Sequence, residues 1–181
     1  IPPYTLDWAL SVADYYNSSG DLEYFRRRLP DLVEIARKYD GPVPKEEFVD
    51  NVPVSGWLFF DWDKRINDPF RKQEEFREQR SAAFTGKFVQ TCRVLAWAAT
   101  SAGEEKLAGT FREIAERHAK RWRQQNPGWQ ERYSIHAITN LLLGGVLQKT
   151  DHEAAFRKAY GDRRGRCTGT PYFGVYVLRA L

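Results

Sequence analysis

The sequence lacks several residue types on which common catalytic and metal sites depend. Its 181 residues include no methionine, two cysteines and three histidines. Cys92 and Cys167 give no spacing rule for a disulfide framework or a metal motif, and histidines this isolated are typical of surface or core residues. No Ser-His-Asp order, phosphate-binding loop or zinc motif occurs. The sequence therefore predicts no metal and no cofactor.

Long hydrophobic runs are missing as well, and so is any convincing alternation of polar and apolar residues along a strand. The longest apolar stretches, such as residues 138–146, are broken by polar residues or glycines and are too short to span a membrane. We therefore expect no membrane partner. A composition of 42% hydrophobic and 29% charged residues is typical of one globular domain with a core.

The positive net charge of +4 is concentrated in basic clusters at residues 26–28, 120–123 and 163–166. A nucleic-acid-binding protein can carry such clusters. Acidic residues interleave with most of these stretches, for example Glu116 and Asp162, and this mixture is more typical of a solvated helix face. We therefore expect no nucleic-acid partner.

Apolar residues recur at helical spacing through most of the chain, as in Tyr4, Trp8, Val12 and Tyr15. This pattern predicts an all-α protein with helices over residues 3–17, 21–39, 74–102, 104–125, 135–147, 150–160 and 173–181, with one helical turn near 45–50. Short connections favour antiparallel neighbours. The helices differ too much to form a fixed-period repeat, so we expect helical hairpins that form part of an irregular toroid.

Several residues predict where these helices begin or end. We expect Gly20 and Gly103 to end helices and Pro30 to kink or divide the second one. N-caps are expected at Asp21, Ser134 and Thr170, and Thr150 with Glu153 has the spacing of a capping box.

The longest loop, within residues 40–72, contains the segment "SGWLFFDWDK" at residues 55–64. Trp rings can pack on the C–H faces of sugars and carboxylates accept hydroxyl hydrogen bonds, so Trp57, Asp61, Trp62 and Asp63 suit a carbohydrate subsite. The alternative is that Trp57, Phe59 and Phe60 close the core beneath the loop. Among other carboxylates, Asp7 and Asp14 share a helix face, but a solvated face explains them equally well, and spacing selects no catalytic pair.

Three segments, "IPPYTLDW…DYYNSSGD", "WLFFDWD" and "TPYFGVYVLRAL", resemble the catalytic domain of bacterial α-L-rhamnosidases, which are six-hairpin (α/α)6 inverting glycosidases. The resemblance implies that residues 1–181 are about half of such a toroid. It also implies that the parent protein removes terminal α-L-rhamnose from glycosides or polysaccharides by inversion. By the same resemblance, Trp8 and Trp62 line the rhamnose pocket, and Asp61 is a further substrate-binding residue that orients the loop.

The resemblance places the general acid before the position of Ile1 and the general base after that of Leu181. It therefore implies no catalytic residue within this chain, which we expect to be inactive alone and to self-associate through apolar faces of the open ring. Two alternatives remain. One is another six-hairpin glycosidase, of glucoamylase or debranching type. The other is a non-enzymatic helical scaffold that binds a protein partner, in which Trp8 and Trp62 would not share a pocket.

Overall fold

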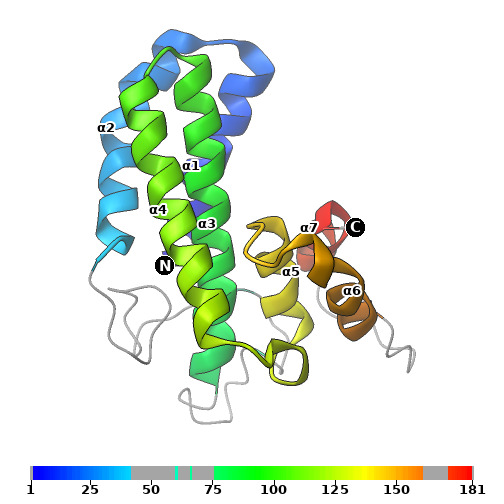
Figure 1. Cartoon of the computed structure of the whole chain (residues 1–181). Helices are drawn as coiled ribbons and strands as arrows, with labels where there is room; N and C mark the ends of the chain where they lie inside the picture. Colours follow the sequence, from blue (N-terminus) through cyan, green and yellow to red (C-terminus); the bar gives the residue numbers. More distant parts are fainter. Residues whose placement is uncertain (1, 42–59, 61–65, 67–75, 161–170, 181) are drawn as a thin grey trace.

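A computed structural model describes residues 2–41, 60, 66, 76–160 and 171–180 (Figure 1). Within these ranges the chain is helical and contains no strand, which confirms the all-α prediction. The α-helices of these ranges are α1 (Pro2–Ser19), α2 (Leu22–Tyr39), α3 (Arg77–Ser101), α4 (Glu105–Gln125), α5 (Ile135–Leu143), α6 (His152–Tyr160) and α7 (Pro171–Ala180). Two short 3-10 turns, η2 (Trp129–Glu131) and η3 (Lys149–Asp151), accompany them.

The long helix α3 is the central element of the fold. It packs against α4, α5 and α1, while α7 packs against α5. Figure 1 shows α3 and α4 side by side and running in opposite directions, with α5, α6 and α7 beside the lower part of α3. Because neighbours cover it on several sides, α3 has buried residues along most of its length.

The helices α1, α3 and α5 run in the same direction. Gln79, near the start of α3, contacts Ser134 at the start of α5, and Arg93, further along α3, contacts Gly145 just beyond the end of α5. Asp7 of α1 likewise pairs with Lys87 of α3, and the two helices share a core cluster nearer their C-terminal ends. The shared direction of α1, α3 and α5 is compatible with successive helical hairpins, and the toroid stays a prediction.

The core consists of two contiguous clusters. One lies around Phe84, Phe88, Trp122 and Ile138, where α3 meets α4 and α5. The other lies around Phe25, Leu32, Leu95 and Phe111, between α1, α2, α3 and α4. Phe60 is 6% exposed and belongs to the first cluster, so the core-closing interpretation is confirmed for this residue. Trp57 and Phe59 lie outside the described residues.

The predicted helix boundaries are partly confirmed. Asp21 caps α2, where its Oδ1 accepts a hydrogen bond of 2.9 Å from the Tyr24 N–H. Gly20 and Gly103 adopt left-handed φ angles of +69° and +79° just beyond helix ends. Pro30 does not divide α2, which continues to Tyr39, and it is exposed on the surface of that helix.

Ser134 occupies the predicted N-cap position of α5, but its hydroxyl makes no capping bond; its N–H instead donates to Gln79 Oε1 at 2.7 Å. Two other boundary predictions were wrong. The capping box is formed by Gln148 and Asp151 rather than by Thr150 and Glu153, because a 3-10 turn precedes α6 and moves the cap upstream. Finally, α5 ends at Leu143 instead of residue 147, ahead of a left-handed φ of +61° at Gly145. The turn near 45–50 and the cap at Thr170 lie outside the described residues.

The contact between α3 and α5 is unusually close at Gly86. A Cβ built on Gly86 would lie 2.3 Å from the Asn140 carbonyl carbon, and one built on Gly144 would lie 2.3 Å from the Gly86 oxygen. The backbones of α3 and α5 therefore touch directly, and only glycine fits at these two positions.

Candidate functional site

Of the predicted sugar-binding residues, Trp8 lies within the described ranges, whereas Trp62 and Asp61 do not. Trp8 lies on α1 and is 39% exposed, one turn beyond Tyr4, which is 44% exposed. Together they present aromatic surface to solvent near the start of α1. Trp62 and Asp61 lie outside the described residues. The pocket shared by Trp8 and Trp62 therefore stays a prediction.

Three helices bring together a polar cluster formed by Asp7, which precedes Trp8 on α1, Lys87 of α3 and Tyr176 of α7. The Lys87 ammonium forms an ion pair and hydrogen bond with Asp7 Oδ1. The Tyr176 hydroxyl donates to the same oxygen at 3.0 Å. The Lys87 Nζ also lies 4.8 Å from the centre of the Tyr176 ring, within the range of a cation–π contact. We call these residues the Asp7 cluster.

Burial determines the electrostatics of the Asp7 cluster. The Lys87 side chain is 4% exposed and that of Asp7 is 22% exposed. Burial lowers the pKa of Lys87, and the negative charge and hydrogen bond of Asp7 oppose that effect without cancelling it. The result is a carboxylate fixed in one position at the edge of solvent, with a lysine held behind it.

The cluster also distinguishes Asp7 from Asp14, because the sequence alone explained both carboxylates equally well as part of a solvated helix face. Asp14 is exposed on α1, as expected of a solvated helix face. Asp7 is instead turned toward α3 and α7 by its two partners. The surroundings of Asp7 are those of a positioned acceptor for hydroxyl or amide donors.

Sequence reasoning did not single out Lys87 or Tyr176. One signal was available for Lys87, because a lysine between Phe84 and Phe88 interrupts an apolar helical stripe. Nothing comparable marked Tyr176, which is 169 residues from Asp7 and meets it only in the folded chain.

A second buried polar cluster lies at the end of α2. The His118 ring is 2% exposed, and its Nε2 lies 2.9 Å from Asp40 Oδ1, which also pairs with Arg117. The neighbouring Cys92 is fully buried, and its pKa is raised by this burial and by the charge of Asp40, although Arg117 lowers it in part. Cys92 is therefore held as a thiol rather than as a nucleophilic thiolate. His118 is a core histidine with an acidic partner, in agreement with the sequence interpretation.

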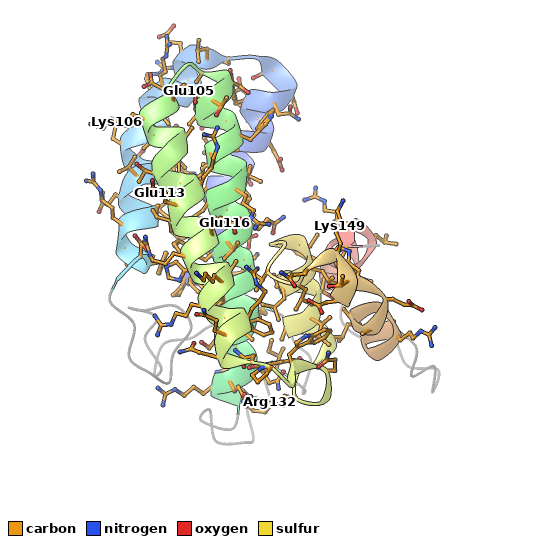
Figure 2. All side chains as sticks on the ribbon, viewed as in Figure 1. Glu105, Lys106, Glu113, Glu116, Arg132 and Lys149 are labelled. Atoms are coloured by element: carbon orange, nitrogen blue, oxygen red, sulfur yellow. The ribbon has the colours of Figure 1, made fainter. Side chains whose placement is uncertain are left out.

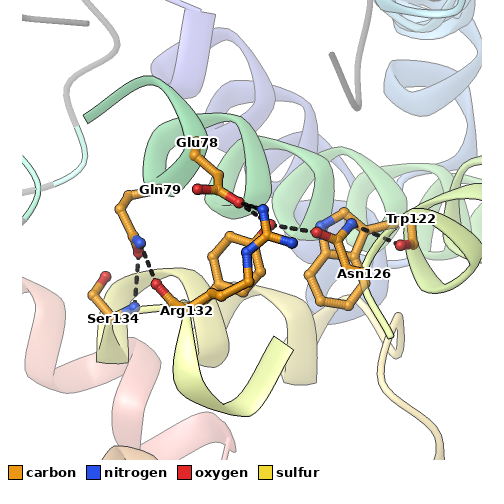
Figure 3. A network of polar contacts seen from close by, with 7 residues as sticks. Glu78, Gln79, Trp122, Asn126, Arg132 and Ser134 are labelled. Atoms are coloured by element: carbon orange, nitrogen blue, oxygen red, sulfur yellow. Dashed lines mark hydrogen bonds and ion pairs between the residues drawn. The ribbon is translucent and has the colours of Figure 1, made fainter. Parts of the chain in front are cut away.

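A third network fixes the connection between α4 and α5 (Figure 3). Tyr133 OH lies 2.6 Å from Asn126 Oδ1 and 3.2 Å from Glu78 Oε1, and Arg132 pairs with Glu78. Gln79 binds the backbone on either side of Tyr133. Burial raises the pKa of Tyr133 to about 12, and the charge of Arg132 opposes the increase. These contacts tie the segment to the start of α3 and serve the fold.

The described ranges contain no group of three or more His, Cys, Asp or Glu side chains placed to hold a metal ion. In the same ranges, every helix is too short or too polar to cross a membrane. No protein-family model matches the chain, and no curated protein or solved structure matches it either. The class that the structure defines is thus an all-helical protein, and the resemblance to rhamnosidases depends on the three sequence segments.

Proposed function

We propose that the chain is the sugar-binding part of an inverting six-hairpin glycosidase, with terminal α-L-rhamnose as its substrate. The observations that carry the proposal are the exposed indole of Trp8 and the fixed carboxylate of Asp7, which precedes it on α1. The resemblance of three sequence segments to α-L-rhamnosidases supplies the choice of sugar.

This pairing of groups suits a sugar for a physical reason. The indole face offers apolar surface for the C–H groups and the methyl group of a deoxysugar. Asp7, held by Lys87 and Tyr176, lies one residue away and can accept a hydroxyl hydrogen bond without paying the cost of reorientation. Exposed tryptophan without such a partner occurs elsewhere in the chain, at Trp97 of α3, which is 47% exposed.

Trp97 provides a matched control for the test. It is ten residues beyond Lys87, so it lies about 15 Å further along α3. The experiment compares the binding of methyl α-L-rhamnoside with that of methyl α-D-glucoside to the wild-type, Trp8→Ala and Trp97→Ala chains by ligand-observed NMR. We expect Trp8→Ala to weaken rhamnoside binding by about 1–3 kcal/mol and Trp97→Ala to leave it unchanged.

Two outcomes of this experiment, and one outcome of an activity assay, contradict parts of the proposal. Equal affinity of the wild-type and Trp8→Ala chains for the rhamnoside excludes a sugar-binding role for Trp8 of α1. A preference for the glucoside favours a glucoamylase-like or debranching-type enzyme. Release of an aryl alcohol from an aryl α-L-rhamnoside by the isolated chain contradicts the inference that the catalytic acid and base are outside it.

A second candidate is a helical scaffold that associates with itself or with another protein. Among the described residues, all the large apolar side chains that are strongly exposed belong to three helices, α1, α3 and α7, and Leu178 of α7 is the most exposed at 73%. Exposed apolar surface of this kind marks interfaces. Sedimentation analysis of wild type and Leu178→Asp over a concentration series tests it. A wild-type chain that stays monomeric at all concentrations contradicts self-association.

A further inference from the structure

A groove lies between α2 and α4, away from the Asp7 cluster. Its volume is about 300 Å³, and its lining comes from one turn of α2 and from the start of α4. Ala36, Phe111 and Ile114 form a buried apolar floor, with Val33 and Leu107 on the walls. Figure 1 shows α2 and α4 as neighbours in the bundle, yet their direct packing is slight, and this separation leaves the groove open.

The rim of the groove carries two cations, Arg37 of α2 and Lys106 of α4. Figure 2 shows Lys106 at the edge of α4 that faces α2. Within the described part of the chain, neither cation has an ion-pair partner. The acid at the rim, Glu104, lies 3.8 Å from the Nε of Arg26, so part of its charge is already balanced. An apolar floor with two cations at its rim is complementary to an anion with an apolar body.

We propose that the α2–α4 groove binds a small amphipathic carboxylate, such as a medium-chain fatty acid. The apolar chain would lie on Ala36, Phe111 and Ile114, and the carboxylate would lie between Arg37 and Lys106. A volume of about 300 Å³ is at the lower end of the range for small-molecule sites, about 300–1,000 Å³, and is too small for a whole helix. The inference does not depend on sugar binding at Trp8.

The test uses sodium octanoate as the probe, with octylammonium and octanol as charge controls, all below their micellar or solubility limits. Amide NMR spectra of the full chain are recorded during each titration. We expect octanoate to shift amides of residues 33–37 and 106–114 in a saturable way, and octylammonium to bind at least tenfold more weakly because the rim is cationic. Added salt should weaken octanoate binding, since both cations are exposed.

Matched variants test the role of the rim. Lys106→Gln and Arg37→Gln should each weaken octanoate about two- to fivefold, as expected for exposed charge pairs. Lys120→Gln on α4 and Arg27→Gln on α2 remove the same charges outside the groove and should have no effect. Thr110→Phe places an aromatic ring at the groove edge and should reduce binding without altering spectra of α1 or α5.

Several results overturn the proposal. Octylammonium or octanol binding as tightly as octanoate excludes the charge-based recognition. Shifts that map to α1 or α7 instead place the ligand on the exposed apolar surface there. If octanoate causes no shifts but an acidic amphipathic peptide saturates the amides of residues 33–37 and 106–114, the groove is a peptide site rather than a carboxylate site.

Discussion

Replacing Gly86 by alanine is the most direct perturbation of this fold. The added Cβ would lie 2.3 Å and 2.4 Å from the carbonyl carbon and oxygen of Asn140, and 2.5 Å from the Leu141 nitrogen. Favourable contacts between carbon atoms occur at about 3.5–4.0 Å. All three atoms belong to the backbone of α5, so no side-chain rotation relieves the clash. The helices α3 and α5 must separate by more than about 1 Å.

The expected cost is the balance of one favourable term and two unfavourable ones. Alanine is favoured over glycine inside a helix by about 1 kcal/mol. Overpacking of a closely packed core typically costs about 1–3 kcal/mol. Separating the helices also loosens Ile138 and Leu141, which are fully buried and whose burial contributes about 1.5–3 kcal/mol each. We therefore expect a net loss of about 1–3 kcal/mol, which lowers Tm by roughly 2–12 °C in a domain of this size.

Gly109→Ala is the matched control for this prediction. Gly109 also lies within a long helix, α4, but nothing lies within 4 Å of its added Cβ. The same chemical change should therefore stabilise the protein by up to about 1 kcal/mol. Urea unfolding monitored by circular dichroism measures both variants. A Gly86→Ala protein as stable as Gly109→Ala refutes the backbone contact between α3 and α5.

Three further predictions concern stability. Lys87→Met should cost about 1–3 kcal/mol in urea unfolding because Asp7 loses its buried cation, and adding Asp7→Asn should recover part of the loss. Tyr133→Phe should reduce the loss of stability at alkaline pH. The phenol of Tyr133 has a pKa of about 12 in the folded protein and about 10 in the unfolded chain, so the wild type loses stability between pH 10 and 12, by at most about 1.4 kcal/mol per pH unit. Equal dependence of the unfolding free energy on pH in the wild type and the variant contradicts the buried phenol. Pro30→Ala should raise Tm, since Pro30 is exposed inside α2 and proline costs a helix interior about 3 kcal/mol relative to alanine; an unchanged or lower Tm contradicts this.

The positions of the helices could be predicted from sequence because each long helix has a continuous apolar stripe. The expected helix over residues 104–125 agrees with α4 to within one residue at its start. Boundaries were less predictable where backbone geometry, not periodicity, decides them. The stripe over residues 135–147 continues through Val146 and Leu147, which are buried, yet the helix stops at Leu143 because the chain turns at Gly145.

The candidate site could be predicted only in part because its contacts join distant positions. Trp8 came from a family resemblance, and Asp7 was noticed as one of several carboxylates. Its partners Lys87 and Tyr176 are 80 and 169 residues away, and local spacing carries no information on such pairs. The α2–α4 groove was missed for the same reason. Phe111 and Ile114 belong to an ordinary apolar stripe, and only the distance between two helices leaves part of that stripe uncovered.

The helix α1 differs from α2 and α4 in its charge and its exposed apolar surface, and this difference concerns both candidate functions. The helices α2 and α4 carry charged residues over much of their surface, as expected of helices that face water. The helix α1 has only Asp7 and Asp14 as charged residues, although it exposes Tyr4, Trp8 and Tyr15. Because α1 has so few charged residues, its surface is suited to further packing contacts in addition to those that it makes with α2 and α3. A sugar at Trp8 would cover one turn of this surface, whereas a protein partner would cover the whole stripe to Tyr15. Parallel substitutions of Trp8 and Tyr15 therefore separate the two functions, because only the protein interface requires both.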